Sequence, residues 1–435
     1  MNSEILEFIE LNDVKLIKLA FCDTLGTQKN ISIMASELES AFSDGIPFDA
    51  RAIPTFNDIN CSDLLLCPDS STLTLLPWRS NENSVLRFYC DIKNTDQTPF
   101  EKDARSILKN TVNKFKNKGF NCKIGTECEF YLFKIDENDN YTQTPIDRGG
   151  YFDIPPLDKG EKIRREISLT LDQMGLNPET SHHEEGPGQN EIDFKFTDAL
   201  SSADNFLTFK SVVKSVALFN GYFASFMPKP LSKESGSGMH INLSVYKDGF
   251  NVFADENSDN YKYAKSFIAG ILEKISEITI FLNPINNSYE RLGEFKAPSF
   301  VSWSHQNRSQ LVRIPYASEA KSRIELRSPD SSVNPYLAFA IIIEAGMYGI
   351  ENNLQLQEER NENLFENKNS TKDLNKIPSN LLEAIKNAEN SEFVKSVVGS
   401  ALLEKYIESK KEEWNEFENA GNKEQYYRDM YFESL

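Results

Sequence analysis

The stretch GTECEFYLF, residues 125–133, alternates acidic and apolar side chains with a period of two. Successive side chains of a strand point to opposite faces, so Glu127 and Glu129 share one face while Cys128, Phe130 and Leu132 share the other. The pattern predicts a β-strand with one face on a core. The ordinary explanation for such a pair of glutamates is a strand face exposed to solvent. A functional role would require other polar or charged residues of the chain on the same face.

Other segments have the composition of strands. They are NEIDFKF (190–196), MHINLSVY (239–246), QLVRIPY (310–316) and RIELRS (323–328). NEIDFKF repeats the first pattern, because Glu191 and Asp193 point to one face and Ile192, Phe194 and Phe196 to the other. Two acidic strand faces in one chain favour a functional cluster of acids more strongly than a single acidic face does.

RIELRS carries three charges at alternate positions. In a strand, Arg323, Glu325 and Arg327 point to one face, and Ile324 and Leu326 point to the other. One interpretation is a ladder of ion pairs on a surface. The other is the charged floor of an active site, and the pattern alone leaves both open.

The first hundred residues have the pattern of a small α+β unit. Strands are predicted at VKLIKLAFCD (14–23) and KNISI (29–33), with a Gly-centred turn between them, and a helix is predicted at 35–45. An amphipathic helix follows residue 100, and the tail from residue 351 is helical and rich in charge. We expect an α+β protein with two domains, 1–100 and 101–435.

Composition narrows the class of partner. The chain has 435 residues and a net charge of −19, which argues against nucleic acid or an anionic membrane as the main partner. The acidic start lacks the features of a signal peptide, and no apolar run reaches the length of a membrane span. The six cysteines (Cys22, Cys61, Cys67, Cys90, Cys122 and Cys128) form no CxxC pair. We interpret them as free thiols of a cytoplasmic protein.

Acidic residues and one histidine form a candidate metal set. SHHEEGPGQNE (181–191) contains Glu184 and Glu191, and His240 follows the Gly/Ser-rich loop SGSG (235–238). Two three-ligand sites can be made from Glu127, Glu129, Glu184, Glu191, His240 and Glu325. Hard divalent cations prefer oxygen ligands with an occasional imidazole. Taken alone, His240 is more often a satisfied polar residue and SGSG a flexible turn, and His182 and His183 are interpreted as structural or peripheral.

Four arginines, Arg308, Arg313, Arg323 and Arg327, fall within twenty positions of one another. Guanidinium groups suit phosphate oxygens, so the arginines and the acids together favour metal-assisted phosphoryl transfer. No GxxxxGK[ST] motif is present, so a nucleotide must be held without a P-loop.

At this point the chain resembles glutamine synthetase of the bacterial type, nearly end to end. KLAFCDTLGTQKNISI and GIPFDARAIPTF are similar to its N-terminal β-grasp domain. Motifs of its catalytic domain follow in the family's order: IGTECEFYLF, GGYFDIPPLD, SHHEEGPGQNEIDFKF, FMPKPLSKESGSGMHIN, NPINNSYERL, NRSQLVRIP and RIELRSPDSSVNPYLA. The resemblance implies a catalytic domain built on an antiparallel sheet or partial barrel with surrounding helices. It also implies ATP-dependent ligation, in which the γ-carboxylate of L-glutamate is phosphorylated and an amine displaces phosphate.

By motif position, the resemblance also implies roles for individual residues. One metal would be held by Glu129, Glu184 and Glu191, and another, nearer the ATP phosphates, by Glu127, His240 and Glu325. Glutamate would be held by Arg291, Gly236 and Arg327, the phosphates by Arg308, Arg313 and Arg323, and the nucleotide would be flanked by Glu179, Phe196, Asn242 and Ser244. Tyr151 and Asp49 would lie near the amine, with Asp49 supplied by a neighbouring subunit of a double hexameric ring. The catalytic set is then Asp49, Arg291, Arg308 and Arg327, with magnesium or manganese as the ion.

Three positions depart from the family's pattern. Before Ala-Pro in RLGEFKAPSF (291–300) the family has a Glu that closes over the site and helps to bind ammonium, whereas this chain has Lys296. Glu294 would replace that Glu if the loop shifted. Arg51 follows Asp49 where the family has a small Ser-rich stretch, and Ser235 stands where it has Asn.

Two of these changes add positive charge where ammonium is expected to sit. The first hypothesis remains a glutamine synthetase that uses ammonium. The alternative enzyme is a glutamate–amine ligase whose amine carries an acid that Lys296 and Arg51 grip. The non-enzyme alternative is a regulatory or scaffold protein, which the intact metal and arginine sets disfavour. The remaining explanation is sequence drift in a surface flap, with the side chains of Lys296 and Arg51 both pointing into solvent.

Overall fold

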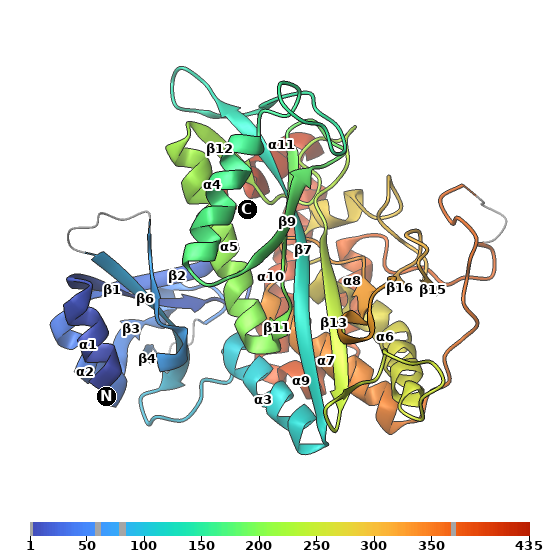
Figure 1. Cartoon of the computed structure of the whole chain (residues 1–435), viewed down its shortest axis with the longest axis horizontal. Coiled ribbons are helices and arrows are strands. Elements are labelled where there is room, and N and C mark those ends of the chain that lie inside the picture. Colours follow the sequence, from blue (N-terminus) through green and yellow to red (C-terminus); the bar gives the residue numbers. More distant parts are fainter. Residues whose placement is uncertain (1–2, 57–61, 78–83, 367–370) are drawn as a thin grey trace.

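The computed structural model describes residues 3–56, 62–77, 84–366 and 371–435, and Figure 1 shows a smaller N-terminal unit beside a larger one. Cys61 lies outside the described residues, and each of the other five cysteines is a free thiol. No helix in the described ranges is long and apolar enough to cross a membrane.

The N-terminal unit is a mixed sheet in the order β2-β1-β6-β4-β3, with β5 paired to β6. Its elements are α1 (Ser3–Leu11), β1 (Val14–Cys22), β2 (Gln28–Met34), α2 (Leu38–Ser43), β3 (Ile46–Asp49), β4 (Asp63–Pro68), β5 (Thr74–Leu75) and β6 (Ser84–Asn94). The predicted turn after β1 holds Gly26 at φ +93°, and its backbone lies against Asn334 of the larger unit. A Cβ there would be strained, so glycine lets the two units approach closely.

The larger unit is built around β7 (Phe120–Ile135), which runs through its middle in Figure 1. The main path of its sheet is β15-β16-β17-β13-β7-β10-β9, and all pairs except β15–β16 are antiparallel. The other strands are β8 (Tyr141–Pro145), β9 (Pro178–His183), β10 (Gln189–Phe194), β11 (Thr197–Asp198), β12 (Tyr222–Ser225), β13 (Met239–Lys247), β14 (Phe250–Asn251), β15 (Trp303–His305), β16 (Val312–Ile314) and β17 (Ile324–Leu326). The predicted α+β class is confirmed.

Nine helices of the described residues belong to this unit, and α3 and α5 pack on β7. They are α3 (Ala104–Asn117), α4 (Glu161–Gln173), α5 (Ala199–Phe219), α6 (Tyr261–Leu282), α7 (Pro335–Glu351), α8 (Leu381–Glu389), α9 (Glu392–Val398), α10 (Ser400–Asn419) and α11 (Lys423–Tyr427). Helix α7 is apolar on every side and buried, as expected of a central helix. It crosses α6 where Gly270 and Gly349 bring the two backbones together.

The alternation of residues 125–133 has the predicted effect on one face of β7. Cys128, Phe130 and Leu132 are wholly buried in the core with the helices. On the opposite face, Tyr131 and Phe133 are covered by C-terminal residues, whereas Glu127 and Glu129 are left to line a cavity. The strand therefore changes from apolar to acidic where its cover ends.

The predicted strand 190–196 is two residues too long. β10 ends at Phe194, and the register with β9 shifts between Ile192 and Phe194. Phe196 thus lies beyond the regular alternation. Periodicity alone extends a strand through such an irregularity because the pattern of side chains continues after the pairing has stopped.

Arg105, at the start of α3, connects the two units. Its guanidinium pairs with Asp204 of α5 at 2.8 Å, with Asp91 of β6 at 2.5 Å and with Asp69 at 3.0 Å. Lys109 pairs with Asp69 and Asp91 as well. The carboxylates come from both units, so this network fixes one sheet relative to the other.

Candidate active site

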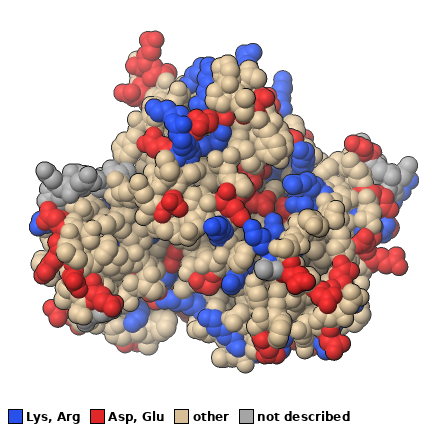
Figure 2. Space-filling view, viewed as in Figure 1, with Lys and Arg blue, Asp and Glu red and all other residues tan. Residues whose placement is uncertain are grey.

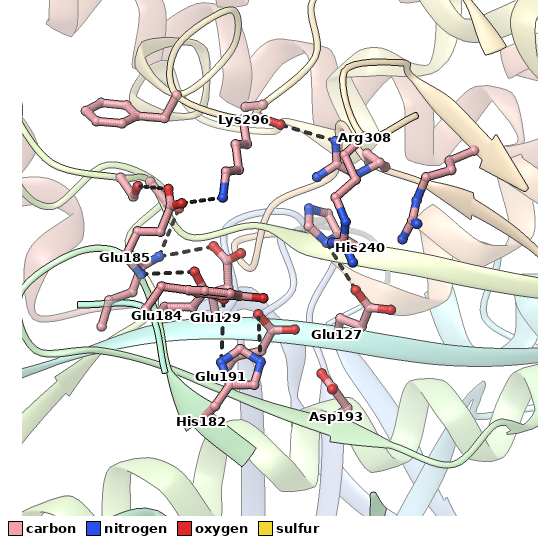
Figure 3. A pocket seen from close by; sticks show the side chains of 18 of the residues that line it. Glu127, Glu129, His182, Glu184, Glu185, Glu191, Asp193, His240, Lys296 and Arg308 are labelled. Atoms are coloured by element: carbon pink, nitrogen blue, oxygen red, sulfur yellow. Dashed lines mark hydrogen bonds and ion pairs between the residues drawn. The ribbon is translucent and has the colours of Figure 1, made fainter. Parts of the chain in front are cut away.

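A cavity of about 770 Å³ opens over the acidic face of β7. Figure 2 shows acidic and basic side chains meeting in the middle of the drawn face, and Figure 3 shows several of them pointing into the cavity. Many of the predicted site residues line it: Glu127, Glu129, Tyr151, Glu184, Glu191, Ser235, Gly236, His240, Arg291, Lys296, Arg308, Arg313, Arg323 and Arg327. The fold thus gathers residues that are up to two hundred positions apart in the sequence.

Three neighbouring strands bring together the first candidate metal cluster. Glu127 of β7 is opposite His240 of β13, and β13 in turn pairs with β17, which carries Glu325. The Nδ1 atom of His240 lies 3.4 Å from a Glu127 oxygen and 3.5 Å from a Glu325 oxygen. One donor atom of each residue lies within 4.8 Å of the others, so this set, predicted as one triad, has the spacing of a cation site.

Glu325 is wholly buried between two guanidinium groups. The Nε atoms of Arg313 and Arg327 donate to its two oxygens at 2.5 and 3.0 Å. A buried carboxylate is tolerated only when it is paired, and here the arginines supply the pairing. Glu325 and Arg327 of RIELRS thus form a buried ion pair rather than a surface ladder, while Arg323 instead donates to Asn242 at 2.9 Å.

A second cluster of possible donor atoms includes two of the three residues predicted for the other metal. Glu184 and Glu191 gather with His182, whose ring nitrogens lie 3.6 and 3.9 Å from them, and Figure 3 shows this ring below the two acids. Glu129 lines the same cavity, but it accepts from the Gly238 N–H at 2.7 Å and from Gln189 Nε2 at 3.2 Å. The spacing of His182 and Glu184 at i and i+2, beside Glu191 on the next strand, was the signal for His182.

His182 lines the cavity, whereas His183 is buried outside its lining. The ring of His183 is buried and its Nε2 lies 3.0 Å from Asp147. Burial disfavours the charged imidazole, but the hydrogen bond and charge of Asp147 outweigh it, so the pKa of His183 is raised.

The acids of the cavity repel one another. Burial, reinforced by Glu184, raises the pKa of Glu129 to about 7, and burial together with Asp193 raises the pKa of Glu191 well above its usual value. Burial also acts on Glu127, but the contacts with His240 and Asn242 outweigh it and lower its pKa to about 2. Carboxylates and imidazoles under such repulsion fit hard divalent cations.

The Gly/Ser-rich loop before β13 is shaped by its contact with Arg291. A Cβ on Gly236 would lie 2.6 Å from the Pro228 oxygen and 2.8 Å from Arg291 Cγ, and one on Gly238 would lie 2.5 Å from Arg291 Nη2. Only glycine fits such a close approach. Arg291 is itself buried and donates to the carbonyls of Arg327 and Ser328 at 3.2 and 2.8 Å.

Other predicted residues lie outside the cavity wall. Asn242 bridges Glu127 and Arg323, and Ser244 is buried with its hydroxyl on the Ser322 carbonyl. Glu179 pairs with Lys321 at 3.0 Å, and the Phe196 ring packs near Lys123. Asp49 is on β3, the edge strand of the N-terminal sheet, where Arg51 donates to both of its oxygens at 3.0 and 2.7 Å.

Comparisons with known proteins agree with this architecture. Residues 13–95 match the glutamine synthetase beta-Grasp domain and residues 101–429 match the glutamine synthetase catalytic domain. The chain belongs to the glutamine synthetase family. It is 43% identical over 420 residues to the glutamine synthetase of Clostridium saccharobutylicum, covering 95% of both chains. It is 44% identical to that of Methanosarcina mazei, covering 95% of this chain and 94% of the relative. A solved structure of GmaS in complex with ADP superposes with a TM-score of 0.87 at 28% identity, covering 97% of this chain and 98% of that one.

Within this glutamine synthetase fold, the flap around Lys296 contains a contact that the sequence did not predict. The Lys296 ammonium forms an ion pair with Glu185, shown by the dashed line in Figure 3, and lies 5.3 Å from the centre of the Tyr151 ring. Glu185 follows Glu184 in the turn between β9 and β10. Adjacency to Glu184 was the only sequence signal for Glu185, because its partners lie 50 and 111 positions away.

Proposed function

We propose that this chain is an ATP-dependent ligase that joins ammonium to the γ-carboxylate of L-glutamate to give L-glutamine. The observation that carries the proposal is one cavity where residues of two acid–histidine clusters face five arginines. Full-length relatives named glutamine synthetase support the same activity.

The residues of the cavity divide the work by charge. Glu127, His240 and Glu325 would hold one divalent magnesium or manganese ion, and Glu129, Glu184 and Glu191 would hold another. Their positive charge would offset the phosphate oxygens. Arg308, Arg313 and Arg323 bind the phosphates of ATP, and a structurally similar protein solved with ADP supports a nucleotide here. Arg291, Gly236 and Arg327 bind glutamate, with Ser235 beside them. Glu179, Phe196, Asn242 and Ser244 remain proposed neighbours of the nucleotide.

The reaction has two transfers. A γ-carboxylate oxygen of glutamate bonds to the terminal phosphorus of ATP, and the bond to ADP breaks. The nitrogen of ammonia then bonds to the γ-carbonyl carbon, the carbon–oxygen bond to phosphate breaks, and the nitrogen gives up protons to become the amide. Arg327 lies beside the cavity and next to Glu325, where it binds the transferred phosphoryl group.

Local charge balance favours ammonium over an amine that carries an acid. Lys296 is paired with Glu185, and Arg51 is paired with Asp49. Each additional cation therefore has its own carboxylate, and the extra positive charge that would grip a substrate acid is largely cancelled.

The proposed assembly is a dodecamer of two stacked rings in the cytoplasm. Asp49 and Arg51 lie at the edge of the N-terminal sheet and do not line the cavity of their own chain, which supports a role for Asp49 in the cavity of a neighbouring subunit. The division at residue 100 remains part of the proposal, and a core cluster made only of residues from the first hundred supports it.

The test is formation of glutamine and release of phosphate from ATP, glutamate and magnesium, with ammonium and then with a panel of amines and amino acids. We expect turnover with ammonium that depends on all components. Turnover with an acid-bearing amine alone would replace the proposal with the alternative ligase. Bound ATP with no phosphate release for any amine would refute ligase activity and favour a regulatory protein.

A further inference from the structure

Two of the departures from the family's pattern meet at one carboxylate. Glu185 forms an ion pair with Lys296 through one oxygen and accepts from the Ser235 hydroxyl at 3.4 Å through the other. Figure 3 shows Glu185 between the flap above it and the cluster with Glu184 below it. Since all three residues line the cavity, the replacements at 296 and 235 are parts of one contact.

The flap is shaped so that Lys296 reaches this carboxylate. Gly293 and Phe295 adopt positive φ angles, and the turn closes with hydrogen bonds between Gly293 and Ala297 and between Ala297 and Glu294. The Lys296 carbonyl also accepts from Arg327 at 3.3 Å. These contacts fix the backbone at Lys296, and its ammonium lies over the Tyr151 ring.

Glu294 also lines the cavity, but its carboxylate pairs with a different lysine from the one that Glu185 holds. It pairs with Lys229 at 3.2 Å, and Lys229 also lies over the Phe295 ring at 4.3 Å. Glu185 is thus the carboxylate that pairs with the Lys296 ammonium, which lies 5.3 Å from the centre of the Tyr151 ring.

We propose that Glu185 binds the substrate ammonium and that Lys296 is a tethered ammonium that holds this position until the substrate displaces it. The proposal rests on the function proposed above and adds the group that recognises the amine. The lysine Nζ and the ammonium ion have the same charge and both donate hydrogen bonds, so a site that accepts one accepts the other. The face of Tyr151 attracts either cation.

The exposure of the two side chains explains how substrate ammonium can replace Lys296 on Glu185. The side chain of Lys296 is 56% exposed and that of Glu185 is 32% exposed. A partly exposed ion pair is weakly held, so Lys296 can turn toward water when ammonium arrives. Glu185 keeps its bond to Ser235 and stays in position.

The experiment compares Glu185→Gln and Lys296→Met with the full-length wild-type enzyme, using the KM values for ammonium, glutamate and ATP. Lys296→Met removes the competitor, so the KM for ammonium falls about twofold to fivefold. Glu185→Gln removes the charge that binds the cation, so the KM for ammonium rises about tenfold. The KM values for glutamate and ATP stay within about twofold, because their proposed binding residues are unchanged.

Hydroxylamine is the charge-free probe, because it is largely uncharged at neutral pH and attacks the same acyl phosphate. Its KM is expected to change less than twofold in both variants, whereas a flap that had merely come loose would alter both nucleophiles alike. Glu294→Gln, which breaks the other ion pair of the flap, is the matched control and leaves the ratio of the two KM values unchanged. Glu185→Asp keeps the carboxylate and restores part of the ammonium affinity.

Equal shifts for ammonium and hydroxylamine, or an ammonium KM that is the same in all variants, would overturn the role of Glu185 while leaving the proposed function intact. A wild-type enzyme with no ammonium turnover would instead refute the proposed function and, with it, this inference.

Discussion

Arg105→Met is expected to weaken the connection between the N-terminal sheet and the catalytic unit. Methionine keeps most of the apolar stem but removes the guanidinium. The Arg105 side chain is 3% exposed and donates to both oxygens of Asp204, at 3.1 and 2.8 Å, as well as pairing with Asp91 and Asp69. The substitution therefore changes the surroundings of three carboxylates at once.

The magnitude depends on what each carboxylate retains. Asp204 is 8% exposed, and leaving a buried carboxylate without its cation costs about 3–5 kcal/mol. The Tyr336 hydroxyl still donates to Asp204 at 2.6 Å, which favours the lower end. Asp69 and Asp91 are 17% and 24% exposed and keep Lys109, so they add less than about 1 kcal/mol. We expect a total loss of about 3 kcal/mol.

The assay is urea unfolding followed by tryptophan fluorescence at one protein concentration, because assembly changes the apparent stability. Arg165→Gln is the matched control, since Arg165 forms an exposed pair with Glu161 and its loss costs about 0.5 kcal/mol or less. A loss in Arg105→Met that does not exceed the control would refute the reasoning. It would mean that water satisfies these carboxylates and that the network does not connect the units.

Three further predictions concern the site, a buried histidine and a helix crossing. Glu325→Gln removes the negative charge that lies between two buried guanidinium groups, and with it a carboxylate donor of the first candidate metal cluster. We expect the magnesium affinity, measured by activation of turnover, to fall at least about tenfold. Unchanged activation would contradict a role in metal binding. Because the pKa of His183 is raised in the folded state, its stabilising effect is complete below about pH 6.5 and is lost as the pH rises through the folded-state pKa. In thermal melts between pH 5 and 9, the melting temperature of Asp147→Asn should therefore decline less with rising pH than that of the wild type. Parallel curves would refute the linkage. Gly349→Ala places a Cβ within 2 Å of the Ser266 oxygen, so it should lower the free energy of unfolding by about 1–3 kcal/mol in urea. The control Gly421→Ala, whose Cβ meets nothing within 4 Å, should leave the free energy of unfolding unchanged. Equal effects of the two substitutions would mean that the helices separate without cost.

The sequence alone determined the class of fold and which residues form the first candidate metal cluster. Alternation places Glu127, His240 and Glu325 on the same face of their strands, and that face is fixed by the need to bury Cys128 and its neighbours on the other. The polar side of a half-buried strand can therefore be predicted without coordinates. The assignment of the activity needed the longer motifs, and the domain division at residue 100 stays a prediction.

Only the tertiary structure decided how the remaining charges are partnered. His182 lies beside Glu184 and Glu191, while Glu129, in the same cavity, accepts from the Gly238 N–H. Lys296, which by pattern alone adds a free cation where the resemblance places ammonium, is paired with Glu185 from a turn 111 positions earlier. Periodicity shows to which face of a strand a side chain points. The charge that this side chain meets depends on how closely another segment of the fold approaches it, and periodicity along one strand carries no information about that approach.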